Sequence, residues 1–132
     1  MKIPFAKVDC SGNEQAYVQS VLENGWLTTA DKTREFEERF AEAVGTKFAC
    51  AMNSCTAALH LGLEALGVGS GDKVLVQSMT FTSSAEVVRY LGADPVLLDC
   101  DPYTRLLNPE ILEQAIELHP EAKAVVVVHF AG

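Results

Sequence analysis

The sequence predicts an α/β protein with a mainly parallel sheet covered by helices. From residue 47 onward, short apolar runs of strand length alternate with longer runs of helix-forming residues. Such alternation is typical of βαβ units, whose strands run parallel. A polar stretch follows each expected strand, and parallel sheets bind ligands at the carboxyl ends of their strands. The expected strands are 47–51, 73–77, 95–99 and 124–129, and the helices between them are 57–66, 85–91 and 109–118.

Two further helices are expected before this alternation begins. The first starts at Ser11 and stops at Gly25, and the second, over residues 33–44, carries Phe36 and Phe40 on one stripe and stops at Gly45. We therefore expect a helical N-terminal segment at residues 1–46, followed by an α/β region at residues 47–132.

The individual elements of the α/β region have clear local signals. Glycines at 67, 69 and 71 predict a turn before the apolar run 73–77. Pro109 suits the first turn of a helix. The run 124–129 is rich in valine and uninterrupted, which predicts a strand buried on both faces.

Composition excludes several classes of protein. The net charge of −8 over 132 residues argues against a nucleic-acid binder, which needs clustered lysines and arginines. No apolar stretch approaches the roughly 18 residues of a membrane span, so we place the protein in the cytoplasm. Cys10, Cys50, Cys55 and Cys100 form no zinc-type pattern, and we expect Cys50 and Cys100 to be buried thiols. No metal site is predicted.

The junction at residues 52–56 is a polar turn between an expected strand and an expected helix. Ser54 and Thr56 lie at the helix start, where free N–H groups and the positive end of the helix dipole coincide. One interpretation is a helix cap formed by Asn53 or Ser54. The other is a binding site for phosphate. A nucleophilic role for Cys55 is less favoured, because no histidine base is placed beside it by the sequence.

Other polar residues should converge on the same edge of the sheet. These are residues 78–84, which include Phe81, residues 99–101, and His129. A phosphate at the turn and an aromatic ring at the mouth of the next strand suit a flat phosphorylated cofactor, and pyridoxal 5'-phosphate (PLP) fits that description. The alternative for Phe81 is packing in the core. No Gly-rich dinucleotide or P-loop motif is present.

Seven short blocks resemble, in order, the start of one enzyme family. The blocks are GWLTT at 25–29, FEERFA at 36–41, NSCTAAL at 53–59, GDKV at 71–74, MTF at 79–81, GADPV at 92–96 and VHFAG at 128–132. Together they resemble the DegT/DnrJ/EryC1/StrS sugar aminotransferases, which are PLP enzymes of fold type I. The chain would then form an incomplete large, cofactor-binding domain of that fold.

The resemblance implies roles for particular residues. It puts the cofactor phosphate on Ser54, Cys55 and Thr56, and the ring of Phe81 against the cofactor. Thr29 lies in a segment that resembles a loop near the active site and the dimer interface, which makes it a candidate for substrate contact, although Ala30 and Asp31 depart from the Gly-Pro that often follows. His129 is a candidate for the substrate pocket, with simple strand termination as the alternative.

No catalytic residue is predicted within the chain. In the family, the lysine that forms a Schiff base with PLP and the carboxylate that binds the pyridinium nitrogen lie after the VHFAG block. None of the chain's six lysines is well placed, and Asp99 and Asp101 are interpreted as turn and capping residues. We therefore expect the chain to bind PLP weakly or not at all alone, and to be inactive alone.

Three functions stay open at this point. The resemblance implies a parent aminotransferase that moves an amino group from an amino acid, with glutamate expected, to a nucleotide-linked keto-sugar. A PLP-dependent sugar dehydratase of the same family is the second, and a non-catalytic, self-associating fragment is the third. An incomplete sheet leaves apolar edges uncovered, so a homodimer or higher homo-oligomer is expected.

Overall fold

The computed structural model describes residues 3, 4 and 6–130, and the chain divides into two compact units, residues 1–51 and 52–132. Lys2 and the last two residues of the VHFAG block lie outside the described residues. None of the described helices is long and apolar enough to cross a membrane.

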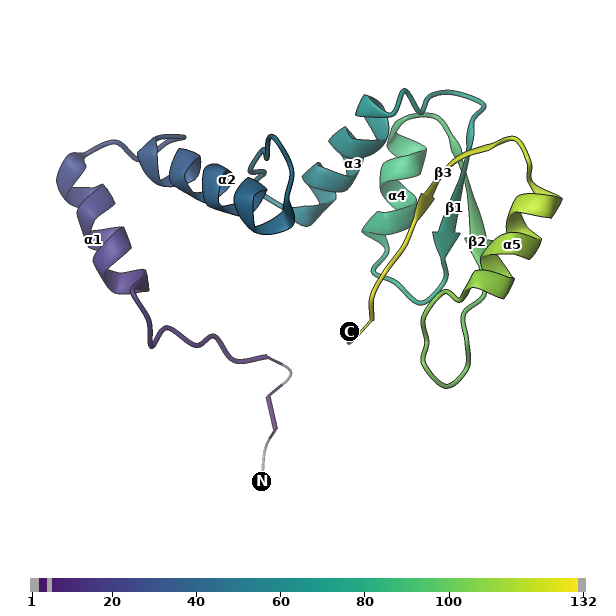
Figure 1. The fold of residues 1–132 in the computed structure, drawn as a ribbon, viewed down its shortest axis with the longest axis horizontal. Coiled ribbons are helices and arrows are strands. Elements are labelled where there is room, and N and C mark those ends of the chain that lie inside the picture. Colours follow the sequence, from purple (N-terminus) through teal and green to yellow (C-terminus); the bar gives the residue numbers. More distant parts are fainter. Residues whose placement is uncertain (1–2, 5, 131–132) are drawn as a thin grey trace. The chain divides into compact units, whose positions relative to one another are not determined.

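The first unit contains the two expected helices, α1 (Glu14–Asn24) and α2 (Asp31–Val44) (Figure 1). Both end at a glycine in the left-handed conformation, Gly25 and Gly45, each with φ of 70°. Glycine adopts this conformation without the strain that a Cβ atom would add, so the predicted helix ends are confirmed.

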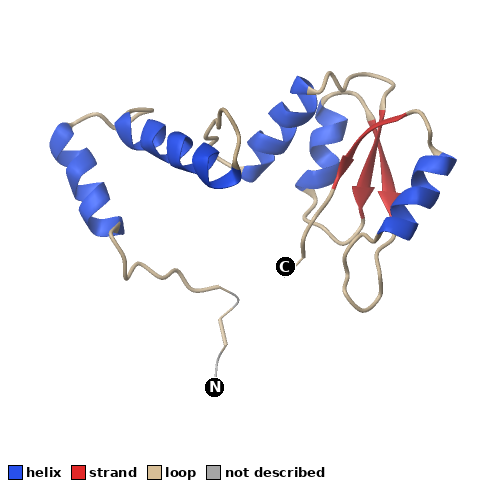
Figure 2. Ribbon diagram, viewed as in Figure 1, coloured by secondary structure: helices blue, strands red, loops and turns tan. Residues whose placement is uncertain are grey.

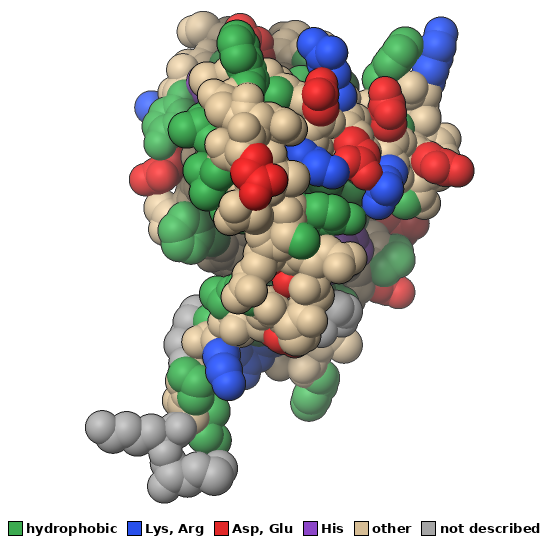
Figure 3. All heavy atoms as spheres, turned by 90° about the vertical axis from the view of Figure 1, so that its left-hand side faces the viewer, with side chains coloured by type: hydrophobic (Ala, Val, Ile, Leu, Met, Phe, Trp, Pro, Cys, Tyr) green, Lys and Arg blue, Asp and Glu red, His purple; other side chains and the backbone are tan. Residues whose placement is uncertain are grey.

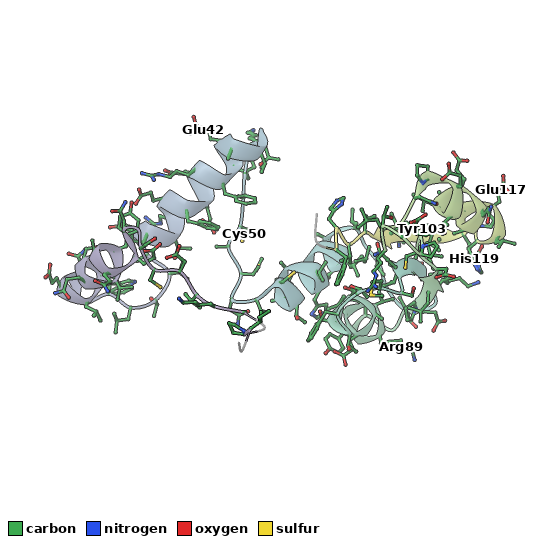
Figure 4. The ribbon with its side chains drawn as sticks, turned by 90° about the horizontal axis from the view of Figure 1, so that it is seen from below. Glu42, Cys50, Arg89, Tyr103, Glu117 and His119 are labelled. Carbon is green, nitrogen blue, oxygen red and sulfur yellow. The ribbon has the colours of Figure 1, made fainter. Side chains whose placement is uncertain are left out.

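Residues 47–51 do not form the expected strand. The backbone N–H of Ala51 donates instead to Glu37 Oε1 at 2.8 Å, and Phe48 is 77% exposed. Figure 4 shows Cys50 on this extended segment after α2, where its thiol is exposed rather than buried. An apolar run becomes a strand only where a neighbouring strand accepts its hydrogen bonds, and the described sheet pairs no strand with this segment.

The second unit is built on three parallel strands (Figure 2). The strands are β1 (Lys73–Gln77), β2 (Asp94–Leu98) and β3 (Ala122–Val126), and β1 lies between the other two. Leu75 is in register with Val96 of β2 and with Val125 of β3. The predicted parallel sheet is thus confirmed.

Helices cover both faces of this sheet. The helices are α3 (Cys55–Ala65), α4 (Ser83–Tyr90) and α5 (Pro109–Leu118). Because side chains alternate along a strand, β1 sends Val74 and Val76 into a core with α3 and α4, and Leu75 into a core with α5. Figure 1 shows α4 and α5 on opposite sides of the strands. The fold class is therefore α/β, as expected.

β3 differs from its prediction. It ends at Val126, three residues before His129. Its residues alternate between half-buried and exposed up to the buried Val126, whereas the sequence predicted that both faces are buried. Val125 is 40% exposed because β3 lies at an edge of the described sheet, where one of its faces is left uncovered. A run of valines predicts a strand well but does not predict what covers each face.

Candidate cofactor site

A hollow of about 520 Å³ lies at the carboxyl edge of the sheet, within the second unit. Its wall includes Cys55 and Thr56 from the start of α3, Phe81 from the loop after β1, and His129 from the segment after β3. Four of the six residues singled out from the sequence are therefore brought together. Their roles there stay predictions.

The start of α3 faces the hollow with unpaired backbone donors. Ser54 is the N-cap residue, and its Oγ accepts a hydrogen bond from the N–H of Ala57 at 3.1 Å. The N–H groups of Cys55 and Thr56 belong to the first turn and have no acceptor within the helix. The structure thus realises the cap interpretation at Ser54, which is not among the residues that line the hollow.

Phe81 stands at the rim of the hollow. Its side chain is 78% exposed, so the alternative of packing in the core is wrong. The residues beside it are held tightly, because the hydroxyls of Thr80 and Ser84 lie 2.7 Å apart in a hydrogen bond and Ser84 is buried. A fixed loop with a free ring is suited to stacking on a flat ligand.

Two aspartates at this edge act within the chain's own turns. Asp101 Oδ1 accepts from the N–H groups of Tyr103 and Thr104 at 2.9 and 2.7 Å. These hydrogen bonds, the one from Thr104 foremost, lower the pKa of Asp101. Asp99 Oδ1 accepts from the N–H of Cys100 at 2.8 Å. Their interpretation as turn and capping residues is confirmed.

Thr29 belongs to the first unit, so its predicted contact with substrate stays a prediction. Its side chain is exposed, and its carbonyl oxygen accepts a 3.4 Å hydrogen bond from Trp26 Nε1. Cys100, expected to be buried, is half-buried. No group of three potential metal ligands occurs in the part of the chain that the structure describes.

Sequence reasoning missed one residue at this edge. Gln77 is fully buried at the end of β1, beside the hollow, and bonds to backbone atoms of three loops. The signal that could have found it was a large polar residue closing an otherwise apolar central strand.

Known proteins match this chain closely. The model of the DegT/DnrJ/EryC1/StrS aminotransferase family matches residues 9–132. Spr1654 of Streptococcus pneumoniae, which is assigned as a sugar aminotransferase, matches in its PMP form with 39% identity and a TM-score of 0.89 over 100% of this chain. Its PLP form matches with 41% identity and a TM-score of 0.79 over 88% of this chain. An aminotransferase of Psychrobacter cryohalolentis matches with 37% identity and a TM-score of 0.86 over 98%.

The fold and these matches together define the class of protein. The chain forms part of a PLP-dependent aminotransferase fold. The chain belongs to the DegT/DnrJ/EryC1/StrS aminotransferase family. It covers 33%, 30% and 33% of those three structures, so it spans about a third of their length.

The hollow fits the phosphate end of PLP. It offers backbone donors at a helix N-terminus and the Thr56 hydroxyl for the phosphate, and the exposed Phe81 ring for the pyridine. No acidic side chain lines the hollow, so an anionic ligand meets no direct repulsion from its described walls.

Proposed function

We propose that this chain forms the phosphate- and ring-binding part of a PLP-dependent aminotransferase. The reaction of the whole enzyme transfers an amino group from an amino acid, with glutamate as the donor, to a nucleotide-linked keto-sugar. The observation that carries the proposal is the convergence of Cys55, Thr56 and Phe81 on one hollow in a chain of this family. When bound, PLP acts as the electron sink for the reaction.

In this proposal, the chain's own residues bind the cofactor and orient it. The N–H groups of Cys55 and Thr56 and the Thr56 hydroxyl donate to the phosphate. Phe81 holds the plane of the ring, and His129 contacts the substrate side of the hollow. Because Ser54 is engaged with Ala57, its side chain serves the phosphate indirectly, by holding the first turn of α3 in place.

We further propose that the second unit supplies no lysine for covalent attachment of the cofactor. Its two lysines both lie at the amino ends of strands, opposite the hollow. Lys73 Nζ lies 2.6 Å from Glu121 Oε1, and Lys123 Nζ lies 3.0 Å from Asp72 Oδ2. Alone, this part of the chain therefore holds the cofactor without starting the reaction.

Titration with PLP, followed by amide chemical shifts, tests the site. Binding with a dissociation constant on the order of 1 mM should move the amide signals of Cys55, Thr56 and Phe81. Thr56→Val should weaken binding about tenfold, because one charge-assisted hydrogen bond is lost. Thr46→Val, a matched change at an exposed residue of the first unit, should leave the affinity unchanged.

Two results would count against the proposal. One is a set of shifts that avoids the start of α3, which would place the phosphate elsewhere. The other is a stable PLP adduct on Lys73 or Lys123 after borohydride reduction and peptide mapping, because it would show that a lysine of the second unit reaches the cofactor.

A further inference from the structure

Gln77 is the buried polar centre of the carboxyl edge of the sheet. It ends the central strand β1, where Val74, Leu75 and Val76 are also buried, and its own side chain is fully buried. Burying a carboxamide is unfavourable unless its donors and acceptor are satisfied. The partners of this side chain therefore indicate why it is tolerated there.

All three partners of Gln77 are backbone groups of separate loops. Nε2 donates to the carbonyl oxygen of Met79 at 3.1 Å and to that of Arg105 at 2.9 Å. Oε1 accepts from the N–H of Val128 at 3.4 Å, the longest of the three bonds. One side chain thus joins the loop after β1, the loop after β2 and the segment after β3.

Two of these loops form walls of the cofactor hollow. Met79 is followed by Thr80 and Phe81, and Val128 is followed by His129. Gln77 therefore connects the wall that carries the aromatic ring with the wall that carries the imidazole. It does not itself line the hollow, so it acts on a ligand only through these loops.

The third loop contains a residue in an unfavourable backbone conformation, whose N–H also donates to the Asp101 carbonyl oxygen at 2.7 Å. Arg105 has a φ of 61°, and it is the only described residue other than glycine with a positive φ. This conformation is unfavourable for a side chain with a Cβ atom. The carbonyl of the strained residue is the one that accepts the shortest hydrogen bond from Gln77.

We propose that Gln77 is a positioning residue of the cofactor site, which sets the spacing of its Phe81 and His129 walls and holds the strained loop at Arg105. A carboxamide provides two donors and an acceptor on one planar group. Methionine has a similar length but lacks the donors, and glutamate keeps acceptors while losing both donors. Neither residue can replace all three bonds.

Amide hydrogen exchange in the free chain tests this role without any cofactor. In Gln77→Met, the Val128 amide should exchange at least about tenfold faster relative to the amides of β1, because the loss of one buried hydrogen bond frees its donor. In Gln77→Glu the acceptor remains, so Val128 should stay protected while the amides of Tyr103 and Thr104 exchange faster.

Leu75→Val is the matched control, since it weakens the same strand without touching the carboxamide. It should accelerate Val128 and the β1 amides by the same factor. Equal acceleration in Gln77→Met would overturn the proposal and leave Gln77 as an ordinary core residue.

If the variants do not fold, hydrogen exchange of the Gln77 side chain in the unaltered chain still tests the proposal. The Nε2 hydrogens of Gln77 should exchange at least about tenfold more slowly than those of Gln114, which is exposed on α5. Equal rates would contradict the two donated hydrogen bonds.

The effect on ligand binding rests on the proposed function. Gln77→Met should raise the dissociation constant for PLP about tenfold, since the two walls lose their common anchor. An unchanged constant in a folded variant that shows the exchange effect would contradict the positioning role. If the unaltered chain binds no PLP, the proposed function fails, while the exchange experiment still decides whether Gln77 holds the loops.

Discussion

The exposed ring of Phe81 allows ligand binding to be separated from folding. Because the side chain is 78% exposed, Phe81→Ala should change the free energy of unfolding by less than about 0.5 kcal/mol. Loss of ring stacking should nevertheless weaken PLP binding about fivefold to tenfold. Urea unfolding and a PLP titration on the same preparation measure both quantities.

Tyr103 is a suitable control for this substitution. It is another exposed aromatic, at 93%, but it does not line the hollow. Tyr103→Ala should therefore leave PLP affinity unchanged. Equal losses of affinity in the two variants would mean that the ring of Phe81 makes no specific contact.

At the residue scale, the sequence predicted which residues line the hollow better than it predicted which residues hold them there. Thr56 and Phe81 could be found because small hydroxyls and an aromatic stand at strand ends, where ligands of parallel sheets bind. Gln77 could not be assigned a role, because its three partners lie in loops between 2 and 51 residues away in the chain. Such contacts depend on loop conformation, which residue types alone do not specify.

At the scale of elements, the central strand was predicted most accurately. β1 spans the same residues, 73–77, in prediction and structure, because turn-forming glycines precede an apolar run that is buried on both faces. Residues 47–51 have a similar apolar character but form no strand, since strand formation also needs a pairing neighbour. The local sequence shows the apolar run, but it does not show whether a neighbouring strand is available for pairing.

The amino edge of the sheet is held by a surface ion pair that joins distant elements. Lys123 of β3 donates to Asp72 Oδ2 at 3.0 Å and to the carbonyl oxygen of Gly67. The bond from Lys123 is the largest cause of a lowered pKa at Asp72, followed by the bond from the Gly69 N–H. The placement of Lys123 at this edge agrees with the sequence-based expectation.

This lowered pKa predicts a dependence of stability on pH. In the unfolded chain Asp72 should titrate near pH 4, and in the folded chain at a lower pH. Its contribution is therefore fully present above about pH 4 and is lost as the pH falls through the folded pKa. Lys123→Met should lower the urea midpoint at pH 7 and reduce its fall below pH 4.

Lys7→Met is the control for this experiment, because it removes the same charge from an exposed residue of the first unit. It should leave the shape of the pH profile unchanged. A Lys123→Met profile that runs parallel to that of the unaltered chain below pH 4 would show that the ion pair does not determine the titration of Asp72.

At the scale of the whole molecule, much apolar surface faces solvent in both units. In the first unit, a hollow of about 500 Å³ is lined by Val18, Leu22, Leu27 and Phe36, each of them more than half exposed. Figure 3 shows hydrophobic side chains at the surface beside acidic and basic ones. The composition predicted a folded α/β protein correctly, but it could not indicate how much of its core-forming surface stays uncovered.

The second unit exposes apolar surface at both edges of its sheet. Leu97 of β2 is 63% exposed, Val125 of β3 is 40% exposed, and Val127, just after β3, is 46% exposed. Edge strands of this kind offer free backbone groups as well as apolar side chains to a second chain. Burial of this surface between copies would remove it from water, which favours association.

We therefore expect the chain to self-associate, with β3 at the contact. Sedimentation at about 50 µM, where a dimer with a dissociation constant of about 10 µM or tighter predominates, should give a dimer or larger species rather than the 14.3 kDa monomer. Val125→Glu should shift the distribution toward monomer, because a charge on an edge strand opposes pairing. Leu118→Glu places the same charge on a 75% exposed side chain at the end of α5 and should leave the distribution unchanged. A monomeric unaltered chain would contradict self-association, and equal effects of the two substitutions would place the contact away from β3.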